Sequence, residues 1–211
     1  MAELVLRTDD VELAANLDVP ADAHAVIVFA HGAGSSRLST RNVAVAEYLR
    51  ATGVFGTLLF DLLTPQEDAT YENRFDIELL STRLVAACRW LHSHSEAEGL
   101  PLGLFGASTG AAAALKASVA IPDLVTSVVS RGGRPDLAAG ALPLVAAPTL
   151  LIVGGADHQV LGLNRQALAM MPAGIARLEI VPGATHLFEE HGALERVAQL
   201  TRDFFSEALE E

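Results

Sequence analysis

The chain contains a single cysteine, Cys88, so no disulfide can form within it. Cys88 continues a helical pattern of apolar residues between Ile77 and Leu91, which predicts that it packs in the core. A thiol on an apolar helix face lacks the electropositive surroundings that activate a cysteine nucleophile. No spacing of cysteine and histidine indicates a metal site, and His92 and His94 are expected at the surface. The sequence therefore predicts neither a metal ion nor an organic cofactor.

Basic residues are also few. The chain has 14 Lys and Arg against 26 Asp and Glu, for a formal net charge of −12. This balance argues against nucleic acid and anionic membrane surfaces as partners. No apolar run approaches the roughly 20 residues of a membrane span, and the N-terminus lacks the basic and apolar regions of a signal peptide. We therefore expect a cytoplasmic protein.

Repeats, linkers and long insertions are missing as well, so residues 1–211 are predicted to form one domain. Apolar runs alternate with helical patterns, and 51% of the residues are hydrophobic. This alternation is typical of a mostly parallel sheet with helices on both faces, a three-layer α/β fold. Segments 3–7 and 11–17 predict an antiparallel hairpin around Asp9 and Asp10 at its edge. No insertion is large enough for a lid domain.

The remaining elements follow from hydrophobic periodicity. Strands are expected at 25–30, 55–60, 102–105, 125–130, 149–153 and 178–181, and helices at 41–52, 75–95, 135–140, 161–171 and 194–209, with a further Ala-rich helix from 111. The segment 61–73 is the longest irregular stretch, and it is the best candidate for a mobile active-site flap.

The most informative motif is Gly106-Ala107-Ser108-Thr109-Gly110, between the predicted strand and the Ala-rich helix. It has the pattern of a nucleophile elbow, a strained turn that exposes one serine hydroxyl above a sheet. Strand and helix approach so closely there that side chains at 106 and 110 would collide. A chain rich in Gly, Ala and Ser can contain G-x-S-x-G by accident, but the strand-turn-helix context favours Ser108 as a nucleophile.

Ligands of open α/β sheets bind beyond the carboxyl ends of the strands, so the residues that follow each strand are the site candidates. After the strand 25–30 comes His31-Gly-Ala-Gly-Ser-Ser36, a loop of the type that supplies an oxyanion-hole donor. We expect the Ala33 N–H, within a one-residue uncertainty over 32–34, to act with the Thr109 N–H. His31 is expected to brace this loop. A phosphate loop is less favoured, because neither phosphate-binding glycine pattern is present.

An acid and a base follow later strands. Asp157 follows the strand 149–153 and can orient an imidazole, although a turn or helix N-cap is the alternative interpretation. Asp136 is the second candidate for the acid. His186 follows the last strand, where this arrangement places its base. His158 adjoins the acid on the same turn, and His191 precedes the last helix, so both are worse placed.

Two arginines, Arg131 and Arg134, also follow a strand at this edge. They could bind a substrate carboxylate in a bidentate manner. The favoured alternative is a structural ion pair with Glu189, Glu190 or Asp136. The candidates for substrate contact are His31, Gly32 and Arg131.

With the elbow, oxyanion loop, acid and histidine in this order, the chain resembles the α/β-hydrolase superfamily, in particular small lidless members such as dienelactone hydrolase and related esterases. The resemblance covers nearly the whole chain and is carried by 31–35, 106–110, Asp157 and His186. It implies that Ser108 is the nucleophile, with His186 as base and Asp157 orienting it. Dienelactone hydrolase itself uses a cysteine nucleophile, so the serine here implies ester hydrolysis without pointing to dienelactone.

The expected function is therefore that of a serine hydrolase acting on a small-molecule ester or thioester. The lack of a lid favours short, soluble acyl groups over long-chain lipids. A non-catalytic binding module with the same fold is one alternative. An acyltransferase or perhydrolase, which passes the acyl group to an acceptor other than water, is another. A peptidase is less expected, because no domain is present to bind peptide.

Overall fold

The structure, a computed structural model, describes residues 2–8 and 11–210. Its strands are β1 (Ala2–Arg7), β2 (Glu12–Asp18), β3 (Ala25–Ala30), β4 (Phe55–Phe60), β5 (Leu102–Ala107), β6 (Val125–Arg131), β7 (Thr149–Gly154) and β8 (Ala176–Val181). They form one sheet in the order β1-β2-β4-β3-β5-β6-β7-β8. β2 pairs antiparallel with both β1 and β4, and the other neighbours are parallel. The predicted hairpin is confirmed, while its turn at Asp9 and Asp10 lies outside the described residues.

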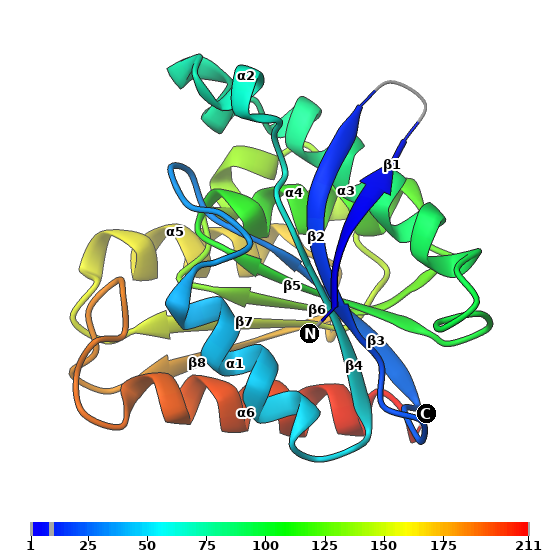
Figure 1. The fold of residues 1–211 in the computed structure, drawn as a ribbon. Helices are drawn as coiled ribbons and strands as arrows, with labels where there is room; N and C mark the ends of the chain where they lie inside the picture. Colours follow the sequence, from blue (N-terminus) through cyan, green and yellow to red (C-terminus); the bar gives the residue numbers. More distant parts are fainter. Residues whose placement is uncertain (1, 9–10, 211) are drawn as a thin grey trace.

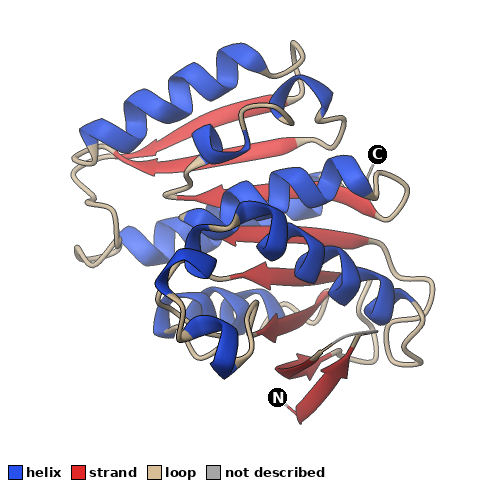
Figure 2. Cartoon of the chain, turned by 90° about the horizontal axis from the view of Figure 1, so that it is seen from above, coloured by secondary structure: helices blue, strands red, loops and turns tan. Residues whose placement is uncertain are grey.

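Helices cover both faces of the sheet, as Figures 1 and 2 show. One layer holds α1 (Thr40–Arg50) and α6 (Ala193–Glu207), and the other holds α3 (Ile77–His92), α4 (Thr109–Ala120) and α5 (His158–Met170). The predicted three-layer α/β-hydrolase fold is confirmed, and the described residues include no inserted lid domain.

Each central strand divides its side chains between two cores. All six residues of β3 are buried. Val26 and Val28 pack in the cluster under α3 and α4, whereas Ile27 and Phe29 pack in the cluster under α1 and α6. A strand buried on both faces needs apolar residues at every position, which is why β3 appears as an uninterrupted apolar run. Cys88 is fully buried in the first cluster, as predicted, and burial raises the pKa of its thiol to about 12.

The segment 61–73, predicted as an irregular stretch, is partly helical. It contains the short helix α2 (Pro65–Asp68) and a 3₁₀ helix, η1 (Tyr71–Phe75). Thr64 and Glu67 cap α2 reciprocally, with Pro65 at its first position. Thr-x-x-Glu followed by a helix is a capping box, a signal visible in the sequence. Arg83, whose side chain is buried, pairs with Glu67 at 2.7 Å and fastens this segment to α3.

Several predicted boundaries shift at capped ends. α5 begins at 158 and not at 161, because the Asp157 side chain accepts a hydrogen bond from the Val160 N–H and caps the helix. α3 covers 77–92 and not 75–95, with Asp76 as its N-cap. The short helix expected at 135–140 is the 3₁₀ helix η2 (Pro135–Ala138), and a further one, η3, covers Leu142–Leu144.

Among the described residues, no helix has both the length and the apolar character needed to span a bilayer. The cytoplasmic location and the absence of nucleic-acid and membrane partners stay predictions.

Candidate active site

Ser108 lies between β5 and α4 in a strained conformation, with φ 51° and ψ −118°. A residue other than glycine held at positive φ costs roughly 1–3 kcal/mol and persists only where its surroundings enforce it. Two backbone contacts do so. The Ser108 N–H donates to the Arg131 carbonyl at 3.2 Å, and the Ser108 carbonyl accepts from the Arg134 N–H at 3.0 Å. The loop that follows β6 therefore holds the elbow in place.

The two elbow glycines are required by close backbone contacts. A Cβ added at Gly106 would lie 2.4 Å from the Ala111 Cα, and one added at Gly110 would lie 2.2 Å from the Ala30 carbonyl oxygen. Both distances are far below van der Waals contact with backbone atoms, so neither position accepts a side chain. The steric reason predicted for these glycines is confirmed.

The loop after β3 lies against Ser108. A Cβ added at Gly32 would come within 3.2 Å of the Ser108 Cβ, so glycine allows the loop to approach the elbow. The next amide, the Ala33 N–H, donates to the Thr109 Oγ1 at 2.8 Å. Ala33 is thus placed beside the elbow as predicted, but its N–H hydrogen is engaged by a hydroxyl and is not free.

The Asp157 carboxylate makes two contacts. Its Oδ2 lies 2.7 Å from the His186 Nδ1, and its Oδ1 accepts from the Val160 N–H at 3.3 Å. A carboxylate only accepts, so Nδ1 carries the imidazole hydrogen and Nε2 is left with its lone pair. The two interpretations of Asp157 are therefore compatible, because one oxygen caps α5 while the other holds the histidine.

Ser108, Asp157 and His186 line one cavity of about 250 Å³. Its other lining residues are Arg134, Gln159, Val160 and Leu163. The Asp157 side chain is 13% exposed and that of His186 is 39% exposed, so the imidazole is open to the cavity. No hydrogen bond joins Ser108 Oγ to His186 among the described residues. Such contacts often tighten only when substrate binds.

The other candidates for acid and base lie elsewhere. Asp136 forms a two-point ion pair with Arg134, at 2.8 Å for each oxygen, and is not bonded to a histidine. This confirms the favoured interpretation of Arg134 as a structural ion pair. His158 and His191 are exposed.

Arg131 differs from Arg134, because the ion pair expected for it is not found among the described residues. Its guanidinium is buried, and its one acceptor among the described residues is the Asn42 Oδ1 at 3.3 Å. Its Nε and Nη1 have no partner there. Glu189 pairs with Arg41 instead. Burial, with a smaller contribution from the neighbouring Arg41 charge, lowers the pKa of Arg131 to about 10.

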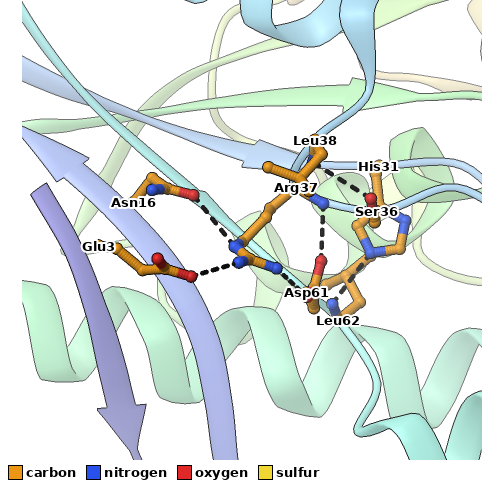
Figure 3. A network of polar contacts seen from close by, with 8 residues as sticks. All are labelled: Glu3, Asn16, His31, Ser36, Arg37, Leu38, Asp61 and Leu62. Atoms are coloured by element: carbon orange, nitrogen blue, oxygen red, sulfur yellow. Dashed lines mark hydrogen bonds and ion pairs between the residues drawn. The ribbon is translucent and has the colours of Figure 1, made fainter. Parts of the chain in front are cut away.

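His31 braces the loop 31–36, which follows β3, through both ring nitrogens. Its Nδ1 lies 2.9 Å from the Gly32 carbonyl oxygen, and its Nε2 accepts from the Leu62 N–H at 3.0 Å (Figure 3). These contacts fix the tautomer with hydrogen on Nδ1. Burial lowers the pKa of His31, which keeps the ring neutral. With both nitrogens engaged, His31 has no ring donor or acceptor left for a substrate.

A network centred on Arg37 was missed by the sequence analysis (Figure 3). The Arg37 guanidinium donates to Glu3 at 2.7 Å, to Asn16 at 3.0 Å and to Asp61 at 2.8 Å, and its N–H donates to the same Asp61 carboxylate at 2.7 Å. These contacts tie the oxyanion loop to the hairpin and to the end of β4. No motif marks Arg37, because its partners come from three separate segments.

The described residues contain no group of three or more His, Cys, Asp or Glu side chains arranged to hold a metal ion. The arrangement of a strained serine, an imidazole held through its Nδ1 and a carboxylate is suited to nucleophilic catalysis by the side chains themselves.

Comparisons with known proteins place the chain among hydrolases. The crystal structure of a dienelactone hydrolase from Anabaena variabilis superimposes with a TM-score of 0.94 at 49% identity, over 98% of this chain and 96% of that one. Est1E from Butyrivibrio proteoclasticus superimposes with a TM-score of 0.85 at 16% identity over the full length of both chains, which is a likeness of fold. No protein-family model matches the chain.

One curated relative carries the name of a transferase and not of a hydrolase. A protein of Mycobacterium tuberculosis called "Putative phosphoribosyl transferase Rv0571c" is 55% identical over 207 residues, which are 98% of this chain but 46% of that protein. The chain thus spans about half the length of the curated relatives it matches. The match to the Anabaena protein, in contrast, covers nearly the whole length of both chains in sequence and in structure. The chain belongs to the dienelactone hydrolase family of the α/β-hydrolase superfamily.

Proposed function

We propose that the chain is a serine hydrolase that cleaves small carboxylic esters or thioesters through an acyl-enzyme on Ser108. The observation that carries the proposal is the 2.7 Å contact between Asp157 and His186 in the same cavity as the strained Ser108. In the tautomer that this contact favours, hydrogen is on Nδ1 and the His186 Nε2 is the acceptor that a general base requires.

In the first half of the reaction, the Ser108 Oγ attacks the acyl carbonyl carbon, and its proton passes to the His186 Nε2. The carbonyl π electrons move to oxygen, which becomes an oxyanion held by the amides at the start of α4 and in the oxyanion loop. Asp157 stabilises the imidazolium that forms. His186 then gives its proton to the leaving alkoxide or thiolate as the bond to it breaks.

In the second half, water attacks the acyl-serine. His186 takes a proton from this water and returns it to the Ser108 Oγ when the tetrahedral intermediate collapses, releasing the carboxylic acid. The enzyme ends in its starting state, and no metal or organic cofactor is needed for any step.

The cavity favours small acyl groups. Its volume of about 250 Å³ is below the roughly 300–1,000 Å³ typical of pockets for drug-sized ligands. We expect activity on acetyl and propionyl esters that decreases as the acyl chain lengthens. A preference for long chains would contradict this size limit.

Phosphoribosyl transfer, which the name of the mycobacterial relative suggests, is not favoured by any feature of this site. We propose that such an activity belongs to the part of those relatives that this chain does not match. The test is to incubate the protein with a phosphoribosyl donor and a nucleobase. We expect no transfer by this chain, whereas transfer that survives Ser108→Ala would contradict the assignment.

A fluorophosphonate probe tests the activated serine, because it reacts with serine nucleophiles in assembled sites. We expect one adduct, on Ser108, that is absent from Ser108→Ala and from heat-denatured protein. Labelling of the native protein without ester turnover would favour transfer of the acyl group to another acceptor, whereas a lack of labelling would favour a non-catalytic binding module. Adding alcohols, amines or hydrogen peroxide and analysing the products separates hydrolysis from acyl transfer and perhydrolysis. No adduct at all would contradict the proposal.

A further inference from the structure

Thr109 is buried beside the nucleophile, with 3% of its surface exposed. It differs from three hydroxyl residues that lie further inside their helices. The Thr82, Ser118 and Thr201 hydroxyls donate to backbone carbonyls about one turn earlier in their own helices, at 2.9, 2.8 and 2.7 Å. This is the usual arrangement for a hydroxyl within a helix.

The Thr109 hydroxyl instead acts as an acceptor. Its Oγ1 receives the Ala33 N–H at 2.8 Å, a contact between residues 76 positions apart. Over residues 2–8 and 11–210, the Thr109 hydroxyl donates no hydrogen bond, and its one contact of this kind is the accepted one. A buried hydroxyl with an acceptor interaction and an unused hydrogen is a donor ready for a ligand.

Two observations relate Thr109 to Ser108 and to the loop that follows β3. Thr109 is the residue after the nucleophile and the first residue of α4, so its N–H has no acceptor within its own helix. On the other side, a Cβ at Gly32 would come within 3.9 Å of Ser108 Oγ, and the Ala33 amide is the next one along the chain. The hydrogen bond between Ala33 and Thr109 therefore joins the residue that follows the nucleophile to the loop that approaches it.

We propose that Thr109 supplies two oxyanion donors, its backbone N–H and its Oγ1–H. The Ala33 N–H holds the hydroxyl in place and polarises it, because a hydroxyl that accepts a hydrogen bond becomes a stronger donor. No proton leaves Thr109, which stabilises the charge on the tetrahedral intermediate by hydrogen bonding alone. This inference rests on the proposed hydrolase function and changes one part of it, since Ala33 acts through Thr109 and not directly.

The alternative is that the Ala33 N–H turns to the oxyanion and the Thr109 hydroxyl obstructs it. The two arrangements predict opposite effects of removing the hydroxyl. If Thr109 donates, Thr109→Val removes one oxyanion donor and lowers kcat by roughly 10²-fold. If Thr109 obstructs, the same variant frees the Ala33 amide, and kcat stays unchanged or rises.

The experiment measures kcat and KM for p-nitrophenyl acetate in the wild type, Thr109→Val and Thr109→Ser. Valine keeps the shape of threonine and its backbone N–H, and serine keeps the hydroxyl without the methyl group. Thr201→Val is the matched control, since it removes a fully buried helix hydroxyl in α6. We expect Thr109→Val to lose roughly 10²-fold in kcat with little change in KM, and Thr109→Ser and Thr201→Val to stay within a few-fold of the wild type.

A second readout separates transition-state stabilisation from structural damage. A short alkylboronic acid forms a tetrahedral adduct with the active serine and resembles the intermediate. Its affinity should fall in Thr109→Val by the same factor as kcat.

Three results would overturn the proposal. Unchanged or raised kcat in Thr109→Val would show that the hydroxyl is no donor. Equal losses in Thr109→Ser and Thr109→Val would assign the effect to side-chain packing at this position and not to the hydroxyl. Unchanged boronate affinity alongside lower kcat would assign it to another step. A wild type that neither labels with fluorophosphonate nor hydrolyses the ester would overturn the hydrolase function itself, which is a distinguishable failure.

Discussion

The two oxygens of Asp157 contact different partners, so substitutions can separate catalysis from stability. Oδ2 holds the His186 Nδ1–H, and Oδ1 accepts the Val160 N–H at the start of α5. In Asp157→Asn the amide oxygen can still cap the helix, because asparagine is as good an N-cap as aspartate. The amide NH₂ replaces the acceptor that faces the imidazole, so His186 is pushed to the tautomer with hydrogen on Nε2.

The expected magnitudes follow from these contacts. The wrong tautomer cannot accept the serine proton, and a comparable substitution lowers kcat about 10⁴-fold. The free energy of unfolding should be nearly unchanged in Asp157→Asn. Asp157→Ala loses the cap as well, which costs about 1 kcal/mol and lowers Tm by about 2–4 °C in a domain of this size.

The assay combines ester hydrolysis with thermal unfolding for both variants, with Asp136→Asn as the control. Asp136 pairs with Arg134 and has no bond to a histidine, so its neutralisation should leave kcat within a few-fold of the wild type. The reasoning fails if Asp157→Asn keeps more than a tenth of the activity, or if Asp136→Asn causes the larger loss.

Three further predictions concern stability, each measured by denaturant unfolding. Burial lowers the pKa of His31 in the folded state, so the unfolded chain binds the proton more readily, and stability should hold above about pH 6.5 and fall as the pH drops below it. His31→Gln should reduce this dependence of stability on pH, and an identical dependence in the variant would contradict the prediction. Arg131→Met removes a buried charge with no carboxylate partner among the described residues and should raise the free energy of unfolding by about 1–4 kcal/mol. Arg83→Met removes the ion-pair partner of the Glu67 carboxylate and should lower the free energy of unfolding by about 3 kcal/mol. A loss of stability in both variants would show that the Arg131 charge is stabilised where it lies. Gly110→Ala should prevent folding, because its Cβ would lie 2.2 Å from a backbone oxygen. Gly162 has open space around it inside α5, so Gly162→Ala should raise the free energy of unfolding by about 0.5–1 kcal/mol. Similar stabilities of the two variants would refute the steric argument.

The elements that could be predicted are those whose signal is local. β3 and β5 appear as uninterrupted apolar runs because both of their faces are buried. The elbow could be recognised from Gly106, Ser108 and Gly110, since only glycine fits between the crossing backbones. The short helix at 65–68 was missed although its capping box is visible in the sequence, because a helix of four residues is too short to show hydrophobic periodicity.

The features that could not be predicted depend on contacts between distant segments. The hydrogen bond from Ala33 to Thr109 needs a particular side-chain rotamer, which only the packing of the oxyanion loop against α4 determines. The Arg37 network joins residues from the hairpin, the loop after β3 and the end of β4. For Arg131, residue type alone favoured an ion pair, but Glu189, one of the carboxylates expected to pair with it, is bound to Arg41 instead.

The most direct test of the central claim is to trap the acyl-enzyme. Wild-type protein is mixed with p-nitrophenyl acetate, quenched in acid within milliseconds to seconds, digested and analysed by peptide mass spectrometry. The account predicts one acetyl group, on Ser108, formed together with a burst of nitrophenolate and absent from Ser108→Ala. Acetylation of another residue, or turnover that persists in Ser108→Ala, would contradict it.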